Sequence, residues 1–428
     1  MTNDTRRVLF VDQTAQLGGA ELCLQDLVQR RGSSDRVVLF DNGPLVELLQ
    51  NAGIDVAVCP LSERAATLRK ASGLAQKFGA IGGLLSLICQ VAKQARGFEV
   101  IYANTPKAFV VSALAGLIAR RPVIYHLHDI LSREHFSRSN LRLLVTLANR
   151  LTSQVIANSQ ATAEAFANAG GNCRKVTVIY NGFDVAAFAS TGNLVRNGDR
   201  QFLASLDADA NASSAEHPVA EFPFLGRQSA AGDREAVLPD AEVAASMQLV
   251  AVFGRLAPWK GQHVAIEALA KLPKVHLLLV GDALFGEDDY VAALRTSADA
   301  EAVRGRVHFL GFRDDIVALM RCADVVVHCS TAPEPFGRVI VEAMLSRRPV
   351  IASNAGGAAE IIKHEQTGLL TPLGDATALA AAIRRLLADP VLACSLATAG
   401  YADAAARFRL EDRVAETNAI IENIATKS

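Results

Sequence analysis

The sequence predicts an α/β protein of two domains, each with a parallel sheet covered by helices on both faces. The chain has 428 residues, which exceeds the ~250–300 residues at which one hydrophobic core normally splits. Short apolar segments alternate with segments of helical period, the order that builds a buried parallel sheet. Both halves also place glycines between a strand and the following helix, as phosphate-binding folds do.

Composition narrows the classes of function. Hydrophobic residues make up 50% of the chain and the formal net charge is -1, which indicates a soluble globular protein and no nucleic-acid partner. The seven cysteines are scattered without a C-x-x-C pair, as expected of core residues in a reducing cytoplasm. The amino terminus lacks the pattern of a signal peptide, and the longest apolar run, residues 78–92, is shorter than the ~20 residues of a membrane span. We therefore expect a cytoplasmic protein.

The amino-terminal half begins with a predicted strand at residues 8–11, which leads to Gly18-Gly19-Ala20-Glu21. This glycine pair opens an amphipathic helix that is expected to end near residue 29. A strand, a glycine turn and a helix start form a phosphate-binding arrangement, although a tight packing turn has the same pattern. Further strands and helices are predicted at residues 36–40, 45–52, 56–59, 100–102, 107–119, 123–126, 155–158, 159–169 and 176–180.

Two histidines follow the predicted strand at residues 123–126, in Tyr125-His-Leu-His-Asp129. Alternate residues of a strand share a face, so His126 and His128 are placed together. A metal site would need a third ligand, and none is evident nearby in the sequence. A metal site with a ligand from elsewhere in the chain and a buried core histidine therefore both stay open as interpretations.

Residues 64–96 carry basic residues around a strongly apolar centre. This composition is typical of a helix that lies on an anionic membrane surface. A buried helix with a basic rim has the same composition. Residues 133–142, also basic, would extend such a surface.

The periodic pattern fails over residues 190–246, which are rich in Ala, Ser, Asp and Gly. A loop longer than ~15 residues in a compact domain is a lid, an insertion or a disordered segment. We expect poor order here and assign no function. The predicted domains are therefore residues 1–189 and 247–405, joined by this segment and followed by a terminal helix at residues 406–428.

The carboxyl-terminal half resumes with a predicted strand at residues 248–253 and the loop Gly254-Arg-Leu-Ala-Pro-Trp-Lys-Gly261. Arg255 and Lys260 are placed to bracket one diphosphate, the first as a planar fork and the second as a point charge. Solvated cations on a loop are the alternative interpretation. Other strands and helices are predicted at residues 275–280, 307–310, 324–329, 350–353, 377–389, 393–408 and 410–426.

Two pairs of adjacent carboxylates are candidate metal ligands. Asp288-Asp289 and Asp314-Asp315 do not follow a strand as metal-binding aspartate pairs do. Solvated helix starts explain both pairs better, so we expect no metal site.

The residues from Ser330 to Met344 predict a ligand site. They follow an apolar strand, open a helix near Phe336 and place Glu334 and Glu342 eight positions apart. A helix that starts at the end of a parallel strand presents N–H groups to phosphate. Carboxylates beside phosphate are best placed to accept hydrogen bonds from neutral hydroxyls, and phosphate with hydroxyls indicates a sugar nucleotide.

The segment Glu334-Pro-Phe-Gly-Arg-Val-Ile-Val-Glu342 resembles the Glu-x7-Glu signature of the retaining glycosyltransferases of the GT4 family. That family has the GT-B architecture, two facing Rossmann-like doubly wound domains with a cleft between them. The loop from Gly254 to Gly261 is similar to the family's donor-phosphate loop. Gly18 and Gly19 match its glycine loop, and His128 matches its acceptor-side histidine. The segment at residues 190–246 is longer than the family's usual interdomain connection.

The resemblance implies a metal-independent, retaining hexosyltransferase. It would move a sugar from a UDP- or GDP-linked donor to a hydroxyl of a glycan or lipid-linked glycan in polysaccharide or glycoconjugate biosynthesis, with no cofactor besides this co-substrate. It also implies a last helix that crosses back to the first domain, and peripheral contact with the cytoplasmic face of a membrane. The implied catalytic residues are His128, Arg255, Lys260 and Glu334. The implied donor-binding residues are Gly18, Gly19, Gly254, Arg255, Lys260, Gly311, Phe312, Arg313, Glu334, Phe336, Gly337, Val339, Ile340 and Glu342.

Three other functions share parts of these expectations. A non-catalytic nucleotide-sugar sensor would bind the donor without transfer, and a sugar-nucleotide epimerase would keep the fold with other chemistry. A phosphorylase would need a lysine for pyridoxal phosphate, for which the sequence has no signature.

Overall fold

The structure is a computed structural model that describes residues 6–32, 34–60, 74–133, 135–190, 248–284 and 286–427. The predicted insertion at residues 190–246, apart from Ser190, lies outside these residues, as do residues 64–73 of the basic and apolar segment. The chain divides into two compact units. The first comprises Met1–Asp184 and Phe408–Ser428, and the second comprises Val185–Arg407.

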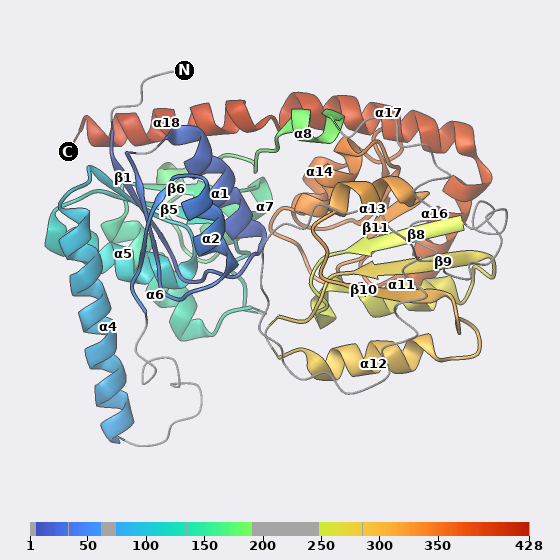
Figure 1. The fold of residues 1–428 in the computed structure, drawn as a ribbon, viewed down its shortest axis with the longest axis horizontal. Helices are drawn as coiled ribbons and strands as arrows, with labels where there is room; N and C mark the ends of the chain where they lie inside the picture. Colours follow the sequence, from blue (N-terminus) through green and yellow to red (C-terminus); the bar gives the residue numbers. More distant parts are fainter. Residues whose placement is uncertain are drawn as a thin grey trace, which may run out of the picture. The chain divides into compact units, whose positions relative to one another are not determined.

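The first unit is built on a parallel sheet with the strand order β3-β2-β1-β4-β5-β6-β7. Helices cover both of its faces (Figure 1). The strands are β1 (Val8–Asp12), β2 (Arg36–Leu39), β3 (Asp55–Val58), β4 (Val100–Ala103), β5 (Val123–Leu127), β6 (Gln154–Ala157) and β7 (Val176–Val178). The helices are α1 (Gly19–Arg31), α2 (Pro44–Asn51), α4 (Leu74–Ala95), α5 (Pro106–Ala119), α6 (Arg138–Leu151), α7 (Gln160–Asn168) and α18 (Leu410–Ala425), with a 3-10 turn at Cys173–Lys175.

The central strands of this sheet are wholly buried. Every residue of β1, β4 and β5 is buried, which explains their continuous apolar sequences. Strand order reverses between β1 and β4, so the loops after these two strands leave on opposite faces and open a crevice at the carboxyl edge. The loops that carry Gly18 and Asn104 follow these strands.

The last helix completes the core of the first unit. Leu410, Val414 and Ile421 of α18 are buried in the same cluster as residues of β1 and β2. α18 packs on α1 (Figure 1), and the backbone of Phe183 exchanges hydrogen bonds with Phe408 and Leu410. A segment at the far end of the sequence therefore belongs to the first hydrophobic core.

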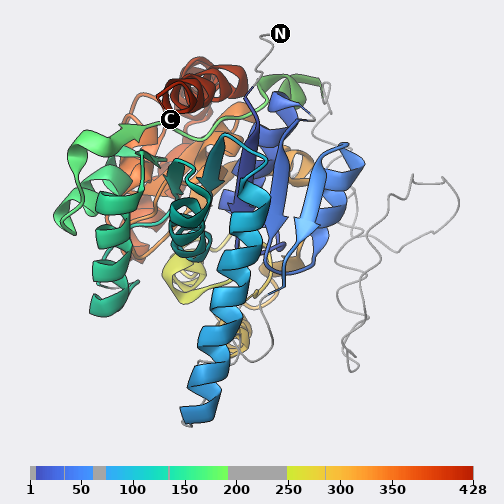
Figure 2. The same ribbon diagram turned by 90° about the vertical axis from the view of Figure 1, so that its left-hand side faces the viewer.

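Helix α4 contains most of the apolar and basic segment at residues 64–96. Its carboxyl-terminal turns bury Leu87, Ile88 and Val91 in the first core. Figure 2 shows its first turns projecting beyond the sheet. None of the described helices has the length and hydropathy to cross a membrane.

The second unit repeats the same architecture, with the strand order β10-β9-β8-β11-β12-β13. All of its described strand pairs are parallel. The strands are β8 (Gln248–Phe253), β9 (Val275–Val280), β10 (Val307–Gly311), β11 (Val325–His328), β12 (Val350–Ser353) and β13 (Leu369–Thr371). The helices are α8 (Val185–Ser190), α11 (Gln262–Leu269), α12 (Asp288–Ala298), α13 (Ile316–Cys322), α14 (Arg338–Leu345), α15 (Gly357–Ile361), α16 (Ala376–Ala388) and α17 (Pro390–Arg407), with a 3-10 turn, η3, at Pro258–Lys260.

Strand order in the second unit reverses between β8 and β11. The loop of residues 254–261 follows β8, and the loop of residues 329–337 follows β11. Ligands of doubly wound sheets bind at such a reversal. The fold therefore places the two loops selected from the sequence at the expected binding edge, and the predicted α/β class is confirmed.

Candidate functional site

The two loops of the second unit are joined by hydrogen bonds. Thr331 N donates to Trp259 O at 2.8 Å, and Cys329 Sγ donates to Gly261 O at 3.1 Å. Gly261 has a φ of 74°, and a Cβ there would lie 1.9 Å from Cys329 O. Only glycine fits this approach, so the residue fixes the loop that carries Lys260 against the loop that carries Glu334.

Lys260 and Glu334 form an ion pair across the two loops. The distance from Lys260 Nζ to Glu334 Oε1 is 2.5 Å, and their side chains are 18% and 11% exposed. Glu334 Oε2 accepts hydrogen bonds from His328 Nε2 at 2.7 Å and from Ser330 Oγ at 2.9 Å. A carboxylate has about four lone-pair sites, so three of them are used by the protein.

Glu334 is held as a carboxylate. Burial alone would raise its pKa, but the charge of Lys260 and the hydrogen bond from His328 together hold the pKa well below the usual range of a glutamate. The negative charge in turn fixes the ammonium of Lys260, which also lies 4.4 Å from the centre of the Trp259 ring. The site therefore contains a positioned ammonium, that of Lys260, whose other N–H groups are directed away from Glu334 Oε1 and can donate to a ligand.

Arg255 lies in the same loop as Lys260. Its Nε is 3.8 Å from Glu287 Oε1, and its backbone carbonyl accepts a hydrogen bond from Gln262 Nε2 at 2.9 Å. Gly254 precedes it with a φ of 125°. Both predicted loop cations are thus anchored by carboxylates of the same unit.

Helix α14 begins at Arg338, two residues later than the expected start at Phe336. Gly337 is its N-cap and has a φ of 101°, a conformation that favours glycine. Ile340 N donates to Gly337 O at 3.0 Å. The first turn of the helix therefore already uses the N–H of Ile340.

The other expected residues of this helix differ in exposure. Phe336 and Ile340 are buried, whereas Val339 and Glu342 are half-buried. Burial raises the pKa of Glu342, against the lowering effect of Arg338, whose Nε lies 3.5 Å from Glu342 Oε1. Glu342 thus has one basic neighbour on its own helix.

The backbone of Glu334 is also fixed. Gly357 N donates to Glu334 O at 2.8 Å, and Glu334 forms a bridge with Gly356. The N–H of Gly357 therefore holds in place the loop that carries Glu334.

The expected base-binding segment follows β10. Gly311 ends the strand with a φ of 63°, and Phe312 is 59% exposed. Arg313 forms two hydrogen bonds with Asp315, at 2.8 and 2.7 Å. Asp315 is therefore engaged in an ion pair, while Asp288 and Asp289 lie exposed in the first turn of α12.

In the first unit, Gly18 caps α1 and Gly19 is its first residue. The carboxylate of Glu21 lies against Gly18, where an added Cβ would be 2.6 Å from Glu21 Oε2. Burial raises the pKa of Glu21 to about 8, with a further contribution from Asp12. The glycine turn thus carries a buried carboxyl group that sequence reasoning had not singled out.

A buried polar network connects β1, β4 and β5. Asn104 Nδ2 donates to Asp12 Oδ2 at 2.6 Å and to Ala20 O at 3.0 Å. Because these bonds fix the amide, its Oδ1 faces His128 Nε2 at 3.0 Å. His128 therefore donates from Nε2, and in the neutral ring the lone pair lies on Nδ1.

A third group lies beside the two histidines. Suitable ligand atoms of Cys23, His126 and His128 all lie within 4.8 Å of one another. Sequence reasoning found no third ligand near the histidines because Cys23 lies on α1, far upstream. No local spacing signal marks it.

Replacing Glu21 with glutamine is expected to change the pH dependence of stability. The folded pKa of about 8 exceeds the ordinary value of 4.5, so the protonated carboxyl stabilises the fold at low pH and this stability is lost as pH rises toward 8. One such proton accounts for at most about 1.4 kcal/mol per pH unit. Urea unfolding between pH 5 and 8 should give a flatter profile for Glu21→Gln. Glu47→Gln, at an exposed position, is the control, and equal slopes in Glu21→Gln and wild type would contradict the assignment.

The family models match both halves of the chain. Residues 45–187 match the model described as Glycosyltransferase Family 4, and residues 236–403 match Glycosyl transferases group 1. A crystal structure of Anabaena HepE in complex with UDP and glucose superposes with a TM-score of 0.80 at 40% identity, covering 97% of this chain and 99% of that chain. The chain belongs to the GT4 family of glycosyltransferases.

Other relatives agree over shorter stretches or at lower identity. The lipopolysaccharide core biosynthesis glycosyltransferase LpsE of Rhizobium meliloti is 35% identical over 211 residues, which are 49% of this chain and 57% of that protein. The chain thus matches about half the length of this curated relative. Sucrose-phosphate synthase of Thermosynechococcus elongatus has a TM-score of 0.72 at 20% identity, covering 99% of this chain and 100% of that chain, and supports the fold alone. The predicted GT-B fold is confirmed.

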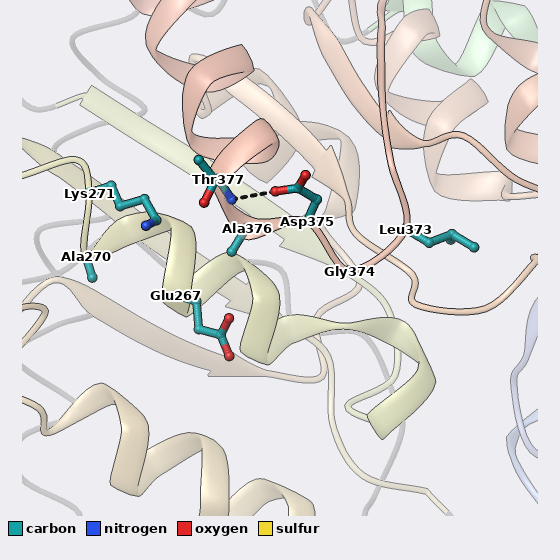
Figure 3. Close-up of a pocket in the computed structure, with 8 residues that line it drawn as sticks. All are labelled: Glu267, Ala270, Lys271, Leu373, Gly374, Asp375, Ala376 and Thr377. Carbon is teal, nitrogen blue, oxygen red and sulfur yellow. Dashed lines mark hydrogen bonds between the residues drawn. The ribbon is translucent and has the colours of Figure 1, made fainter.

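A surface pocket of this GT4 protein lies apart from the residues expected from the family motifs. It has a volume of about 650 Å³ and is lined by α11, the start of α16 and the loop between β13 and α16. Figure 3 shows Asp375 accepting a hydrogen bond from Thr377 N, and Asp375 also accepts from Ala378 N. These two N–H donors at the start of α16 are therefore used by the helix cap, while Lys271, whose ammonium is a donor, also lines the pocket.

Proposed function

We propose that this GT4-family chain is a retaining hexosyltransferase. It moves a sugar from a UDP- or GDP-linked donor to the hydroxyl of a glycan or lipid-linked glycan. The observation that carries the proposal is the Lys260–Glu334 ion pair at the point of strand reversal in the second unit. A positioned ammonium there stabilises the charge that develops on the leaving diphosphate, and it needs no proton transfer.

The other predicted residues complete the donor site. Arg255 adds a second cation in the same loop, and the first turn of α14, including Val339, offers backbone N–H groups. The remaining lone pair of Glu334 accepts from a sugar hydroxyl, and Glu342 accepts from the ribose. The backbone at residues 311–313 borders the base, with Phe312 exposed beside it. Gly18 and Gly19 of the first unit take part in donor binding, and His128 of the same unit takes part on the acceptor side.

Donor binding is expected to raise the unfolding temperature of the chain. A ligand that binds only the folded state stabilises by about 2.7 kcal/mol at one hundred times its Kd. UDP-glucose is the first donor to test, because HepE has been crystallised with UDP-glucose, and GDP-mannose tests the other base.

Mixing donor with candidate glycan acceptors then separates a transferase from a binding protein, since only the transferase forms product. EDTA should leave the rate of transfer unchanged, and strict dependence on Mg²⁺ or Mn²⁺ would contradict the metal-free mechanism.

Peripheral contact with an anionic membrane is the second part of the proposal. Leu85 of α4 and Leu117 and Ile118 of α5 are 57%, 65% and 51% exposed, and α4 packs on α5. Basic residues, among them Lys93 and Arg120, are exposed on the same two helices or directly after them. Apolar side chains beside cations are typical of surfaces that bind anionic lipids.

Vesicle sedimentation tests this contact. Wild type should sediment with phosphatidylglycerol vesicles more than with phosphatidylcholine vesicles, and this preference should weaken as salt rises. Leu117→Glu combined with Ile118→Glu should reduce the bound fraction, because it places carboxylates against the anionic surface. Leu284→Glu, exposed in the second unit, is the matched control. Equal sedimentation of wild type and the double variant would argue against the contact.

A further inference from the structure

The strongest unexplained feature is the cluster of Cys23, His126 and His128 in the first unit. Cys23 lies on α1, His126 is part of β5, and His128 follows that strand directly. One ligand atom from each lies within 4.8 Å of the other two, and the imidazole ring centres are 3.8 Å apart. Thiolate and imidazole are ligand types that zinc prefers.

His126 supplies an independent observation. The side chain is buried, and its Nδ1 lies 2.7 Å from the hydroxyl of Tyr102. Its Nε2 is buried as well and meets no hydrogen-bond partner among the described residues. A buried polar atom without a partner is costly, and a metal ion at Nε2 would remove that cost.

The second histidine is prepared for the same role. His128 donates from Nε2 to Asn104 Oδ1, which leaves the lone pair on Nδ1. Asn104 is itself fixed by Asp12 and by the carbonyl of Ala20. Histidines that bind metals generally donate their other ring N–H to an oxygen acceptor in this way, which sets the tautomer and the ring orientation.

We propose that Cys23, His126 and His128 bind one Zn²⁺ ion. The ligands would be Cys23 Sγ as thiolate, His126 Nε2 and His128 Nδ1, and binding releases the thiol proton to solvent. Ligand atoms around tetrahedral zinc are about 3.4–3.6 Å apart, so the three side chains close by about 1 Å when the ion binds. The hydrogen bond that Cys23 now donates to Asn181 Oδ1 at 3.6 Å is given up. Three protein ligands leave a fourth position for water.

The consequence for the enzyme follows from the shared histidine and rests on the proposed function. When Zn²⁺ is bound to Nδ1 of His128, that imidazole can no longer take part on the acceptor side of the proposed transfer. The ion is therefore an inhibitor of transfer and not a cofactor. Transfer by wild type should fall as Zn²⁺ is added and return when EDTA is added.

Co²⁺ titration of the full chain tests the site without any donor or acceptor. Wild type should bind one Co²⁺ ion with a near-ultraviolet thiolate band and the intense visible bands of tetrahedral cobalt, and Zn²⁺ should displace it. Cys23→Ser should lose the thiolate band. His126→Asn keeps an atom near Nδ1 for Tyr102 and removes only the nitrogen proposed as ligand. Each variant should weaken binding by more than the 10–100-fold that loss of an outer partner costs.

Matched controls separate the cluster from adventitious thiols and imidazoles. Cys89 is an exposed cysteine on α4, and His364 accepts from Leu370 N through Nδ1, so Cys89→Ser and His364→Asn should leave the titration unchanged. Melting curves without metal verify that Cys23→Ser and His126→Asn are folded. An absent thiolate band in wild type, or an unchanged titration in folded Cys23→Ser, would overturn the proposal.

The metal site and the proposed function fail independently. Co²⁺ binding that depends on Cys23, in a protein that transfers no sugar, leaves the site intact and removes the transferase. Sugar transfer by a protein that shows no thiolate band with Co²⁺ would support the transferase and exclude the metal site. Inhibition by Zn²⁺ that persists unchanged in Cys23→Ser assigns the inhibition to another site and counts against the proposed ligand set.

Discussion

Lys260→Ala is expected to lower kcat for sugar transfer by ~10²–10³, the effect of removing one preorganised donor from an active site. The loss should lie at the upper end, because the carboxylate of Glu334 then faces the diphosphate without its counter-charge. His328 and Ser330 still donate to Glu334 in this variant, so the fold should persist. Steady-state rates with a saturating donor and a melting curve measure the two effects.

Lys271→Ala is the matched control for this variant. Lys271 is exposed just after α11 in the same unit, so its removal changes the net charge equally without touching the ion pair. A folded Lys260→Ala protein with the full rate of transfer would remove the phosphate assignment.

Glu334→Gln is expected to lower kcat/KM by ~10–10², the range of one charge-assisted hydrogen bond. Glutamine keeps the shape of the side chain and removes the charge that positions Lys260. Burial of Glu334 is compensated by Lys260 and His328, so the neutral variant should remain folded. Glu267→Gln, at an exposed position of α11, is the control.

The double variant shows how Glu334 acts. If Glu334 works by positioning Lys260, Lys260→Ala with Glu334→Gln should be no slower than Lys260→Ala alone. If it also binds a sugar hydroxyl, the two losses should add. A Glu334→Gln protein with unchanged kcat/KM would exclude both roles.

Much of the fold was predictable because parallel strands that are buried on both faces consist of continuous runs of apolar residues. β1, β4 and β5 were each located from such runs. The order of the strands cannot be read from the local sequence, since it depends on which face of the sheet each crossover helix covers. The start of α14 was placed two residues early because the left-handed backbone of Gly337 cannot be read from composition.

The candidate site was predictable in its parts and not in its connections. Motif spacing selected Lys260 and Glu334, yet the ion pair between them joins residues 74 positions apart. The pairing of Arg313 with Asp315 and the use of the Ile340 N–H by its own helix were likewise invisible in the sequence. Cys23 was not predicted as a third ligand, because it lies beside His126 and His128 only after α1 packs against the sheet.

The placement of α18 has a consequence for the order of events during synthesis. Residues 408–428 supply Leu410, Val414 and Ile421 to the core that begins with β1. Domains fold largely as units while the ribosome adds residues, and the whole of Val185–Arg407 is translated before this helix. The unit encoded second can therefore fold first, while the unit encoded first waits, with part of its apolar surface uncovered, for its last helix. Released chains that end at Arg407 should consequently present a protease-sensitive first unit and a more resistant second unit over residues 248–407.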